Sequence, residues 1–582
     1  MPPYALCDKM GEVGQKYNYC GGAMKKRALF TFILIVAIAI SGLYLLKKSS
    51  HPLALKAKAY AKHVITKAVL PPLFNEQKWL AGATEKTFYK GGAKVIATDA
   101  TKRFINYSEG FYFDVPDDFV FETNRVYTTA NSDRGSVTVS REWSFEKNVD
   151  EYIAHYLNRF ILSPQFRESN NISMFENYAK DNMQVITVAI NDLPPDKFDK
   201  YTYIIIKTKT PNFYRLMFKY KSIDRLFHKQ VIDETIKTFK YFSPNPKPIE
   251  ITEFEPVIPD FWSDETSRLY DKIKGLKSLN WGIFAQDIYN DGINNKVPEL
   301  EKKLNYKFGV VLSYLQFGER FPIDFMRKNY ENNKLVELTY QITSSNNEEL
   351  FGYTPFIDIY RGKHDAQIRS FAKEAKEFAM PFLFRLCNEP NSDWTSYSAV
   401  VNMSDPEIYI ANWRRIYNIF KEEGVDNAIW IFNPNDKNYP PCNWNDFTAF
   451  YPGNEFVHMI GVTGYNTGTY YKTEKWREFE NIYDDISKHY LPTFEKFPWI
   501  ITEFATSSVG GNKPLWIRKM FTSLYKYPQI KIAVWFSYAD FEVHTDDEKI
   551  VSRPYWLDET PNTTEEFKKG LQNFNSEALI NH

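Results

Sequence analysis

From about residue 260 onward, short apolar runs alternate with stretches that have helical spacing. The strand-like runs lie at 279–285, 308–313, 335–342, 381–387, 428–432, 457–463, 499–502 and 532–537, and helical segments such as 366–379, 405–423 and 513–525 separate them. Strands that alternate with helices form a parallel sheet, and eight such units in about 300 residues predict a closed (β/α)8 barrel.

The main alternative is a doubly wound open sheet, which normally carries a glycine-rich phosphate-binding turn after its first strand. No such turn follows the run at 279–285. The predicted fold class is therefore α/β: a (β/α)8 TIM barrel at 260–578, preceded by a smaller α+β domain and an N-terminal transmembrane helix.

Two of the apolar runs lead to a glutamate. The run 384–391 reads FRLCNEPN and contains Glu389, and the run 499–504 reads WIITEF and contains Glu503. The carboxyl ends of barrel strands form the face on which catalytic groups lie. Two glutamates on different strands can flank one bond, and paired carboxyl groups are the machinery of glycoside hydrolysis.

The residues around these glutamates resemble glycoside hydrolase family 26, within the clan of retaining (β/α)8 hydrolases. The resemblance covers about 260–575. It rests on four ordered matches: Arg385-x-x-x-Glu389-x-Asn391-x-x-Trp394, Tyr451-Pro452-Gly453 followed by Gly461-Val462-Thr463-Gly464-Tyr465-Asn466, Thr502-Glu503-Phe504, and the run PQIKIAVWF at 528–536.

This resemblance implies that Glu389 is the acid/base and Glu503 the nucleophile. One carboxyl group donates a proton to the leaving oxygen and the other attacks the sugar carbon, and retention needs the two groups about 5–5.5 Å apart. Glu389 then needs a raised pKa, which a charged neighbour at Glu503 helps to provide.

The resemblance also implies a set of substrate-binding residues. Arg385 and Tyr465 would keep the nucleophile ionised and oriented, and Asn388 would hydrogen-bond the sugar's 2-hydroxyl. Trp535 would form the platform under the sugar at the cleavage point, and Trp394 would stack on a neighbouring sugar.

Two positions depart from the family pattern. Asn388 stands where family members usually have histidine, as in other families of the clan, and Thr463 stands where an acidic residue is common. We therefore expect a retaining endo-β-1,4-glycanase, mannanase-like, that hydrolyses a polysaccharide at the cell surface by a two-glutamate double displacement. The alternatives are an endo-β-glucanase or xylanase of the same clan acting on exopolysaccharide, a transglycosylase, and a catalytically inactive glycan-binding or scaffold protein.

Composition argues against other classes. Lys plus Arg and Asp plus Glu both total 72, so the zero net charge gives no reason to expect a nucleic-acid partner. No Cys-x-x-Cys pair or metal-ligand cluster occurs, so no metal and no cofactor are expected. Cys387 and Cys442 are interpreted as two small buried residues, with pairing as the alternative. The sequence leaves the oligomeric state open.

The run ALFTFILIVAIAISGLYLL at 28–46 predicts a transmembrane anchor, because its length as a helix matches the hydrocarbon core. Lys25, Lys26 and Arg27 precede it and favour a cytoplasmic N-terminus at 1–27. A secretory signal peptide is the alternative. Residues 1–23 are interpreted as an extension from a misassigned start codon. The predicted location is the cell membrane, single-pass, with the catalytic domain outside the cytoplasm.

Between anchor and barrel we expect three segments. Residues 47–103 are interpreted as a stalk, and 104–242 as an α+β accessory domain whose pattern faintly resembles the PsbP-like fold and whose favoured role is a spacer. The prolines at 244, 246, 248, 256 and 259 make 243–259 a stiff, extended linker. The accessory domain's predicted strands are 111–116, 136–143, 201–207 and 213–220, and its predicted helices are 149–162 and 229–238.

Overall fold

The computed structural model of the chain describes residues 93–97, 101–122, 127–143, 149–245, 253–286, 288–343, 352–545, 548–574 and 578–580. The predicted cytoplasmic segment, the transmembrane run at 28–46 and the stalk as far as residue 92 lie outside these ranges. Within them, no helix combines the length and the apolar character that a membrane span requires.

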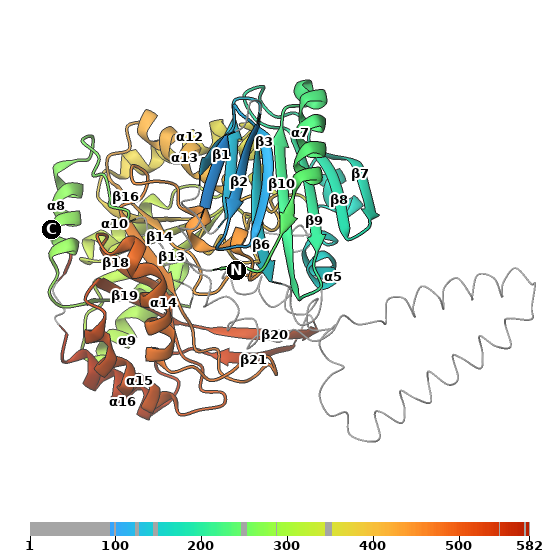
Figure 1. Cartoon of the computed structure of the whole chain (residues 1–582). Helices are drawn as coiled ribbons and strands as arrows, with labels where there is room; N and C mark the ends of the chain where they lie inside the picture. Colours follow the sequence, from blue (N-terminus) through green and yellow to red (C-terminus); the bar gives the residue numbers. More distant parts are fainter. Residues whose placement is uncertain are drawn as a thin grey trace, which may run out of the picture.

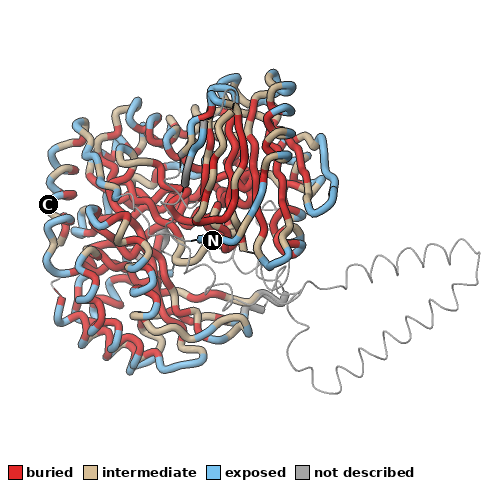
Figure 2. Tube along the Cα trace, viewed as in Figure 1, coloured by how far each residue is buried: buried red, intermediate tan, exposed pale blue. Residues whose placement is uncertain are grey.

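Eight parallel strands close into a barrel, as the alternation of apolar runs predicted (Figure 1). In chain order they are β12 (Asn280–Ala285), β13 (Val310–Gln316), β14 (Leu335–Gln341), β15 (Phe382–Leu386), β16 (Ala428–Phe432), β17 (Met459–Thr463), β18 (Trp499–Phe504) and β19 (Ile530–Ser537). Nearly all of their residues are buried, and Figure 2 shows buried residues in red throughout the interior of the chain. A parallel strand is covered on both faces, which is why each reads as a continuous apolar run.

Helices surround the barrel. Their bounds are α8 (Asp264–Gly275), α9 (Val297–Leu304), α10 (Ile323–Glu331), α11 (Pro355–Arg361), α12 (Asp365–Phe378), α13 (Pro406–Glu422), α14 (Phe479–Phe494), α15 (Lys513–Ser523) and α16 (Pro561–Leu571). Local sequence sets where several begin: Asp405 accepts a hydrogen bond from the Glu407 amide and Pro406 fills the first helical position.

Irregular elements complete the barrel domain. A π-helix, η3 (Ile288–Lys296), precedes α9, and short 3-10 turns η5 (Asn443–Asn445), η6 (Phe447–Phe450) and η7 (Leu524–Lys526) follow later strands and helices. After the eighth strand, β20 (Ala539–Thr545) and β21 (Glu548–Pro554) form an antiparallel hairpin. This hairpin was not predicted from the sequence.

The accessory domain contains two antiparallel sheets. One has the order β1-β2-β3-β11 and the other the order β4-β5-β6-β10-β9-β8-β7. The strands are β1 (Ala93–Ala97), β2 (Thr101–Asn106), β3 (Phe111–Pro116), β4 (Val120–Glu122), β5 (Thr128–Ser132), β6 (Gly135–Trp143), β7 (Ile172–Lys180), β8 (Met183–Ile190), β9 (Lys200–Lys207), β10 (Asn212–Tyr220) and β11 (Lys240–Tyr241). The four predicted strands are present. Since β1 pairs with β2, the domain begins earlier than the predicted residue 104.

Helices of the accessory domain differ in part from the prediction. The segment 149–162 is a short helix α5 (Val149–Tyr152) that continues as a π-helix η1 (Ile153–Leu157) and ends in turns. The predicted helix at 229–238 is α7 (Arg225–Thr238), after the turn η2 (Ser222–Asp224), and α6 (Pro164–Ser169) was not predicted. The PsbP-like resemblance stays a prediction.

The accessory domain lies directly against one side of the barrel (Figure 1). Buried residues of β8, β9 and β10 belong to the same apolar cluster as the barrel core. The described parts of the linker, 243–245 and 253–259, have no helix or strand. The second part also contacts the barrel, since Phe254 stacks on Tyr451 with ring centroids 4.4 Å apart. A spacer that made no contact with the barrel would not share an apolar core with it.

Candidate active site

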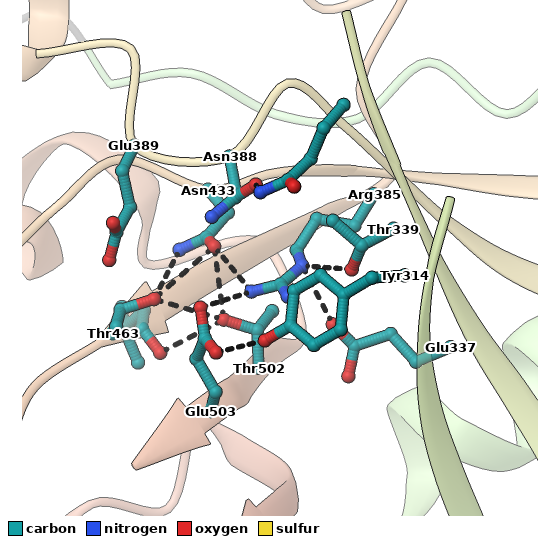
Figure 3. Close-up of polar contacts among 12 residues, drawn as sticks. Tyr314, Glu337, Thr339, Arg385, Asn388, Glu389, Asn433, Thr463, Thr502 and Glu503 are labelled. Carbon is teal, nitrogen blue, oxygen red and sulfur yellow. Dashed lines mark hydrogen bonds and ion pairs between the residues drawn. The ribbon is translucent and has the colours of Figure 1, made fainter. Parts of the chain in front are cut away.

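Glu503 lies in β18, the seventh barrel strand, and Glu389 follows the end of β15, the fourth, as predicted. Figure 3 shows both glutamates with the polar residues that surround them. Glu503 is 1% exposed and Glu389 is 4% exposed, so both carboxyl groups are nearly removed from solvent. At such low exposure, neighbouring donors and charges decide the protonation state of each group.

Three donors converge on Glu503. Arg385 Nη1 donates to Oε1 at 3.1 Å, Tyr465 Oη donates to Oε2 at 3.2 Å, and Tyr314 Oη also donates to Oε2. Burial and the Glu503 charge raise the pKa of Tyr314, so its hydroxyl stays protonated as a donor. Hydrogen bonds to a carboxylate favour its charged form. The structure thus places Arg385 and Tyr465 where the resemblance implied.

Side chains of neighbouring strands hold Arg385 in place. Its Nε donates to Thr339 Oγ1 at 2.6 Å and lies 3.1 Å from Glu337 Oε1, while Nη1 also donates to Asn433 Oδ1 at 3.0 Å. Arg385 and Glu337 are both 0% exposed. Burial raises the pKa of Glu337 to about 8, the Arg385 charge opposes this, and the Glu503 charge adds to it. Arg385 therefore contacts two buried carboxyl groups at once.

A small polar network joins three neighbouring strands beside Glu503. Asn433 Nδ2 donates to Thr463 Oγ1 at 3.2 Å, and Thr502 Oγ1 donates to Asn433 Oδ1 at 3.1 Å (Figure 3). Thr463, which replaces a commonly acidic position, is thus a hydroxyl in this network. The network orients Asn433, which in turn accepts from Arg385.

Glu389 has an environment unlike that of Glu503. Burial, followed by the charge of Glu503, raises the pKa of Glu389 to about 8 from 4.5, while Arg385 opposes the rise. Trp394 Nε1 donates to Glu389 Oε2 at 3.2 Å, and the Glu389 amide donates to the Asn433 carbonyl at 2.7 Å. The φ of Glu389 is 57°, in the left-handed region that non-glycine residues rarely occupy. At neutral pH this carboxyl group is mostly protonated.

Asn388 and Trp394 also belong to the site. Asn388 Oδ1 accepts from Gln341 Nε2 at 2.9 Å and from Tyr397 Oη at 3.0 Å. These two bonds fix the orientation of the Asn388 amide, so its NH2 group is held in place to donate to a ligand. The half-buried Trp394 ring lies 5.3 Å from the half-buried Tyr439 ring. This aromatic pair is suited to stacking on a sugar next to the acid.

Trp535 corrects the expectation of a platform. Its side chain is 0% exposed, its ring lies 4.6 Å from that of Phe567 in α16, and its Nε1 donates to the Tyr555 carbonyl at 3.0 Å. Successive strand residues point to opposite faces, so Trp535 faces the helical layer and its neighbour Phe536 faces the other way. A ring with no exposed surface offers no face to a sugar. The half-buried Tyr538, just beyond β19, is the nearest aromatic with exposed surface on that strand end.

Several site residues were missed from the sequence: Tyr314, Glu337, Thr339, Asn433 and Tyr439. A usable signal existed for Glu337, because it is an acidic residue in the middle of the run LVELTYQ. A fully buried strand has no solvent in which to place such a charge. The other missed residues carry no comparable signal.

The remaining predictions concern metals and cysteines. In the described ranges, no group of three or more His, Cys, Asp or Glu residues could hold a metal ion. Cys387 and Cys442 are both free and buried, as the favoured interpretation had it.

Two buried glutamates lie at the carboxyl ends of two strands of a (β/α)8 barrel, one with a raised pKa and the other bound by three hydrogen-bond donors. This is the arrangement of a glycoside hydrolase domain. Residues 330–491 match Glycosyl hydrolase family 26. The matched residues lie in the barrel, and they match the family that its motifs resemble.

Curated relatives match parts of the chain. Endoglucanase H of Acetivibrio thermocellus is 33% identical over 36% of this chain and 22% of its own length. A mannan endo-1,4-beta-mannosidase of Bacillus subtilis is 31% identical over 25% of this chain and 36% of its own length. The chain thus matches a fifth to about a third of these proteins. Among solved structures, a GH26 beta-mannanase from Bacteroides ovatus is 14% identical, with a TM-score of 0.41, over 55% of this chain and 98% of that one.

Proposed function

We propose that the protein is a retaining endo-β-1,4-glycanase that hydrolyses a mannan-like polysaccharide by double displacement. The observation that carries this proposal is the contrast between its two buried glutamates. Glu503 accepts three hydrogen bonds, one of them from Arg385, whereas the pKa of Glu389 is raised to about 8. When the surroundings raise the pKa of one carboxyl group and hydrogen-bond the other, the first is suited to act as acid and the second as base or nucleophile.

In the first step Glu389 donates its proton to the glycosidic oxygen while a Glu503 oxygen attacks the anomeric carbon. The bond to the leaving sugar breaks as a glycosyl–enzyme ester forms. In the second step Glu389, now a carboxylate, takes a proton from water, which attacks the anomeric carbon and releases Glu503. The Asn388 amide supports both steps by donating to the sugar's 2-hydroxyl, a bond that strengthens in the transition state.

The substrate class rests on the relatives. One is named a mannan endo-1,4-beta-mannosidase and another an endoglucanase, so a β-1,4-glucan is the second candidate. Asn388 and Thr463 replace residues that are typical of the family, and these positions are where a preference for glucan over mannan would arise.

Reducing-end release from mannan, β-glucan and xylan tests the activity. Wild type should cleave one of them, and both Glu389→Gln and Glu503→Gln should lose most of the activity. General acid catalysis contributes about 10²- to 10⁴-fold, which sets the scale for the Glu389 variant. Following the anomeric configuration of the first product by NMR tests retention. Inverted product would refute the double displacement, and binding without cleavage by wild type would favour a glycan-binding protein.

The proposed location is the outer face of a cell membrane, with the run at 28–46 as the anchor. Fractionation of cells that express the full chain, or the chain without 28–46, tests this location. Membrane association that persists without the run would refute the anchor but would not bear on the proposed hydrolase activity.

A further inference from the structure

Glu389 and Trp394 lie in the connection between β15 and α13, residues 387–405, which we call the acid loop. Four residues of this loop have left-handed backbone: φ is 47° at Cys387, 57° at Glu389, 61° at Met403 and 48° at Ser404. Such conformations cost about 1–3 kcal/mol each in residues other than glycine and persist only where the surroundings hold them. The acid loop therefore needs external support.

The accessory domain supplies contacts to three consecutive residues at the end of this loop. Tyr203 Oη donates to the Met403 carbonyl, Arg215 Nη2 donates to the Ser404 carbonyl at 2.6 Å, and Lys219 Nζ lies 3.1 Å from Asp405 Oδ2. Met403 and Ser404 are two of the four left-handed residues, and Asp405 caps α13.

The three donors form one row on the accessory sheet. Tyr203 of β9 pairs directly with Met217 of β10, and Arg215, Met217 and Lys219 alternate along β10. Residues two apart on a strand point to the same face, so all three donors face the barrel together. Tyr203 and Arg215 are each 1% exposed, and a buried donor that loses its acceptor is costly.

A second attachment supports the other part of the loop. Glu142 of β6 accepts from the amides of Asn443 at 2.6 Å and Trp444 at 3.2 Å. Asn445, in the same short turn, donates to the carbonyl of Asn391, two residues after Glu389. Contacts thus run from the accessory sheet through η5 to the backbone beside the acid.

The charge of one accessory-domain arginine also acts on a residue of the acid loop. Burial raises the pKa of Asp393, and the charge of Arg159 counteracts this rise. Asp393 precedes Trp394, whose indole donates to Glu389. The domain therefore contacts the end of the acid loop directly and reaches its first part through η5.

We propose that the accessory domain is part of the catalytic unit, and that Tyr203, Arg215 and Lys219 are positioning residues that hold Glu389 at the reacting bond. This inference rests on the proposed function, because it assigns Glu389 as the acid. The domain would then not be a spacer, and loosening its row of donors would misplace the acid while leaving Glu503 in place.

The test compares two substrates that differ only in their leaving group. An oligosaccharide leaves as a poor alkoxide and needs the proton from Glu389, whereas a dinitrophenyl β-glycoside of the same sugar leaves as a stable phenolate and does not. kcat/KM reports the first chemical step for both. The variants, in the full chain, are Tyr203→Phe, Arg215→Met and Lys219→Met, with Arg361→Met as the control. Arg361 is also a buried arginine at the domain junction, but it lies in α11 and donates to the carbonyls of Asn170 and Asn191.

The positioning variants should lose about 10- to 100-fold in kcat/KM on the oligosaccharide, the cost of a misplaced catalytic group, with little change on the dinitrophenyl glycoside. Arg361→Met should change both substrates equally or not at all. The inference would be overturned if the positioning variants lost kcat/KM equally on both substrates, or lost none. The contacts would then contribute to stability alone. If Arg215→Met does not fold, Tyr203→Phe and Lys219→Met decide. Failure of wild type on both substrates would instead refute the proposed function.

Discussion

Replacing Glu503 by glutamine should lower the pKa of Glu389 by about two units. Burial is the largest cause that raises this pKa to about 8, and the charge of Glu503 is the second. Glutamine has nearly the shape of glutamate but no charge, so the variant removes the second cause and keeps the first.

The size of the effect follows from the separation that retention requires. Two charges about 5.5 Å apart, with an effective dielectric constant of about 20, interact by roughly 3 kcal/mol, which corresponds to about two pKa units. The pKa of Glu389 should fall from about 8 to about 6 and stay above its ordinary value of 4.5, because burial remains. The glycosyl–enzyme ester also neutralises Glu503, so the same fall would convert Glu389 from acid to base midway through the reaction.

Carbon NMR of protein with labelled glutamate carboxyl groups measures this pKa, and subtraction of the Glu389→Gln spectrum assigns the signal. Glu337→Gln is the matched control, because Glu337 is also buried beside Arg385 but is not among the main causes acting on Glu389. A pKa that stays near 8 in Glu503→Gln would show that the two carboxyl groups are too far apart for double displacement.

Three other variants test the surroundings of the site. Arg385→Met leaves Glu503 buried without its cation and should lower the free energy of unfolding by about 3–5 kcal/mol in urea titrations, whereas Arg385→Lys should lower it less. Equal unfolding midpoints for wild type and Arg385→Met would contradict this. Trp394→Phe removes a hydrogen bond that lowers the pKa of Glu389, so the basic limb of kcat/KM against pH should move to higher pH, and a move to lower pH would be evidence against the assigned contact. The pKa of Glu337 is raised from 4.5 to about 8 in the folded protein, so its contribution to stability is complete below pH 4.5 and is lost as the pH rises through about 8. In scanning calorimetry, the Tm of wild type should therefore fall more steeply over this pH range than the Tm of Glu337→Gln. Parallel curves would refute the raised pKa of Glu337.

The barrel and the positions of the two glutamates at its carboxyl end were predictable from the sequence. The strands of a parallel barrel are buried on both faces, so each one is a continuous apolar run that can be recognised without its partners. The carboxyl ends of these runs all lie on one face of the barrel, so Glu389 and Glu503 could be assigned to a common site. Polar residues inside the strands, such as Glu337 and Tyr314, lie next to Arg385 only because the barrel closes. Their place in the site therefore did not follow from the sequence.

Trp535 shows why an aromatic residue beside a catalytic strand is hard to place. A shift of one residue in a strand moves every side chain to the opposite face, and sequence spacing does not fix that register at a strand end. The structure gives Trp535 to the helical layer, where it contacts Phe567.

By itself, the sequence determined the order of strands and helices, the family that the barrel resembles and the two carboxyl groups of the candidate site, because these features depend on local patterns of apolar and polar residues. Only the tertiary structure decided that Glu503 receives three donors from different strands, and that Arg215 of the accessory domain reaches Ser404 in the acid loop. Such contacts join residues far apart in the chain, and no local pattern encodes them.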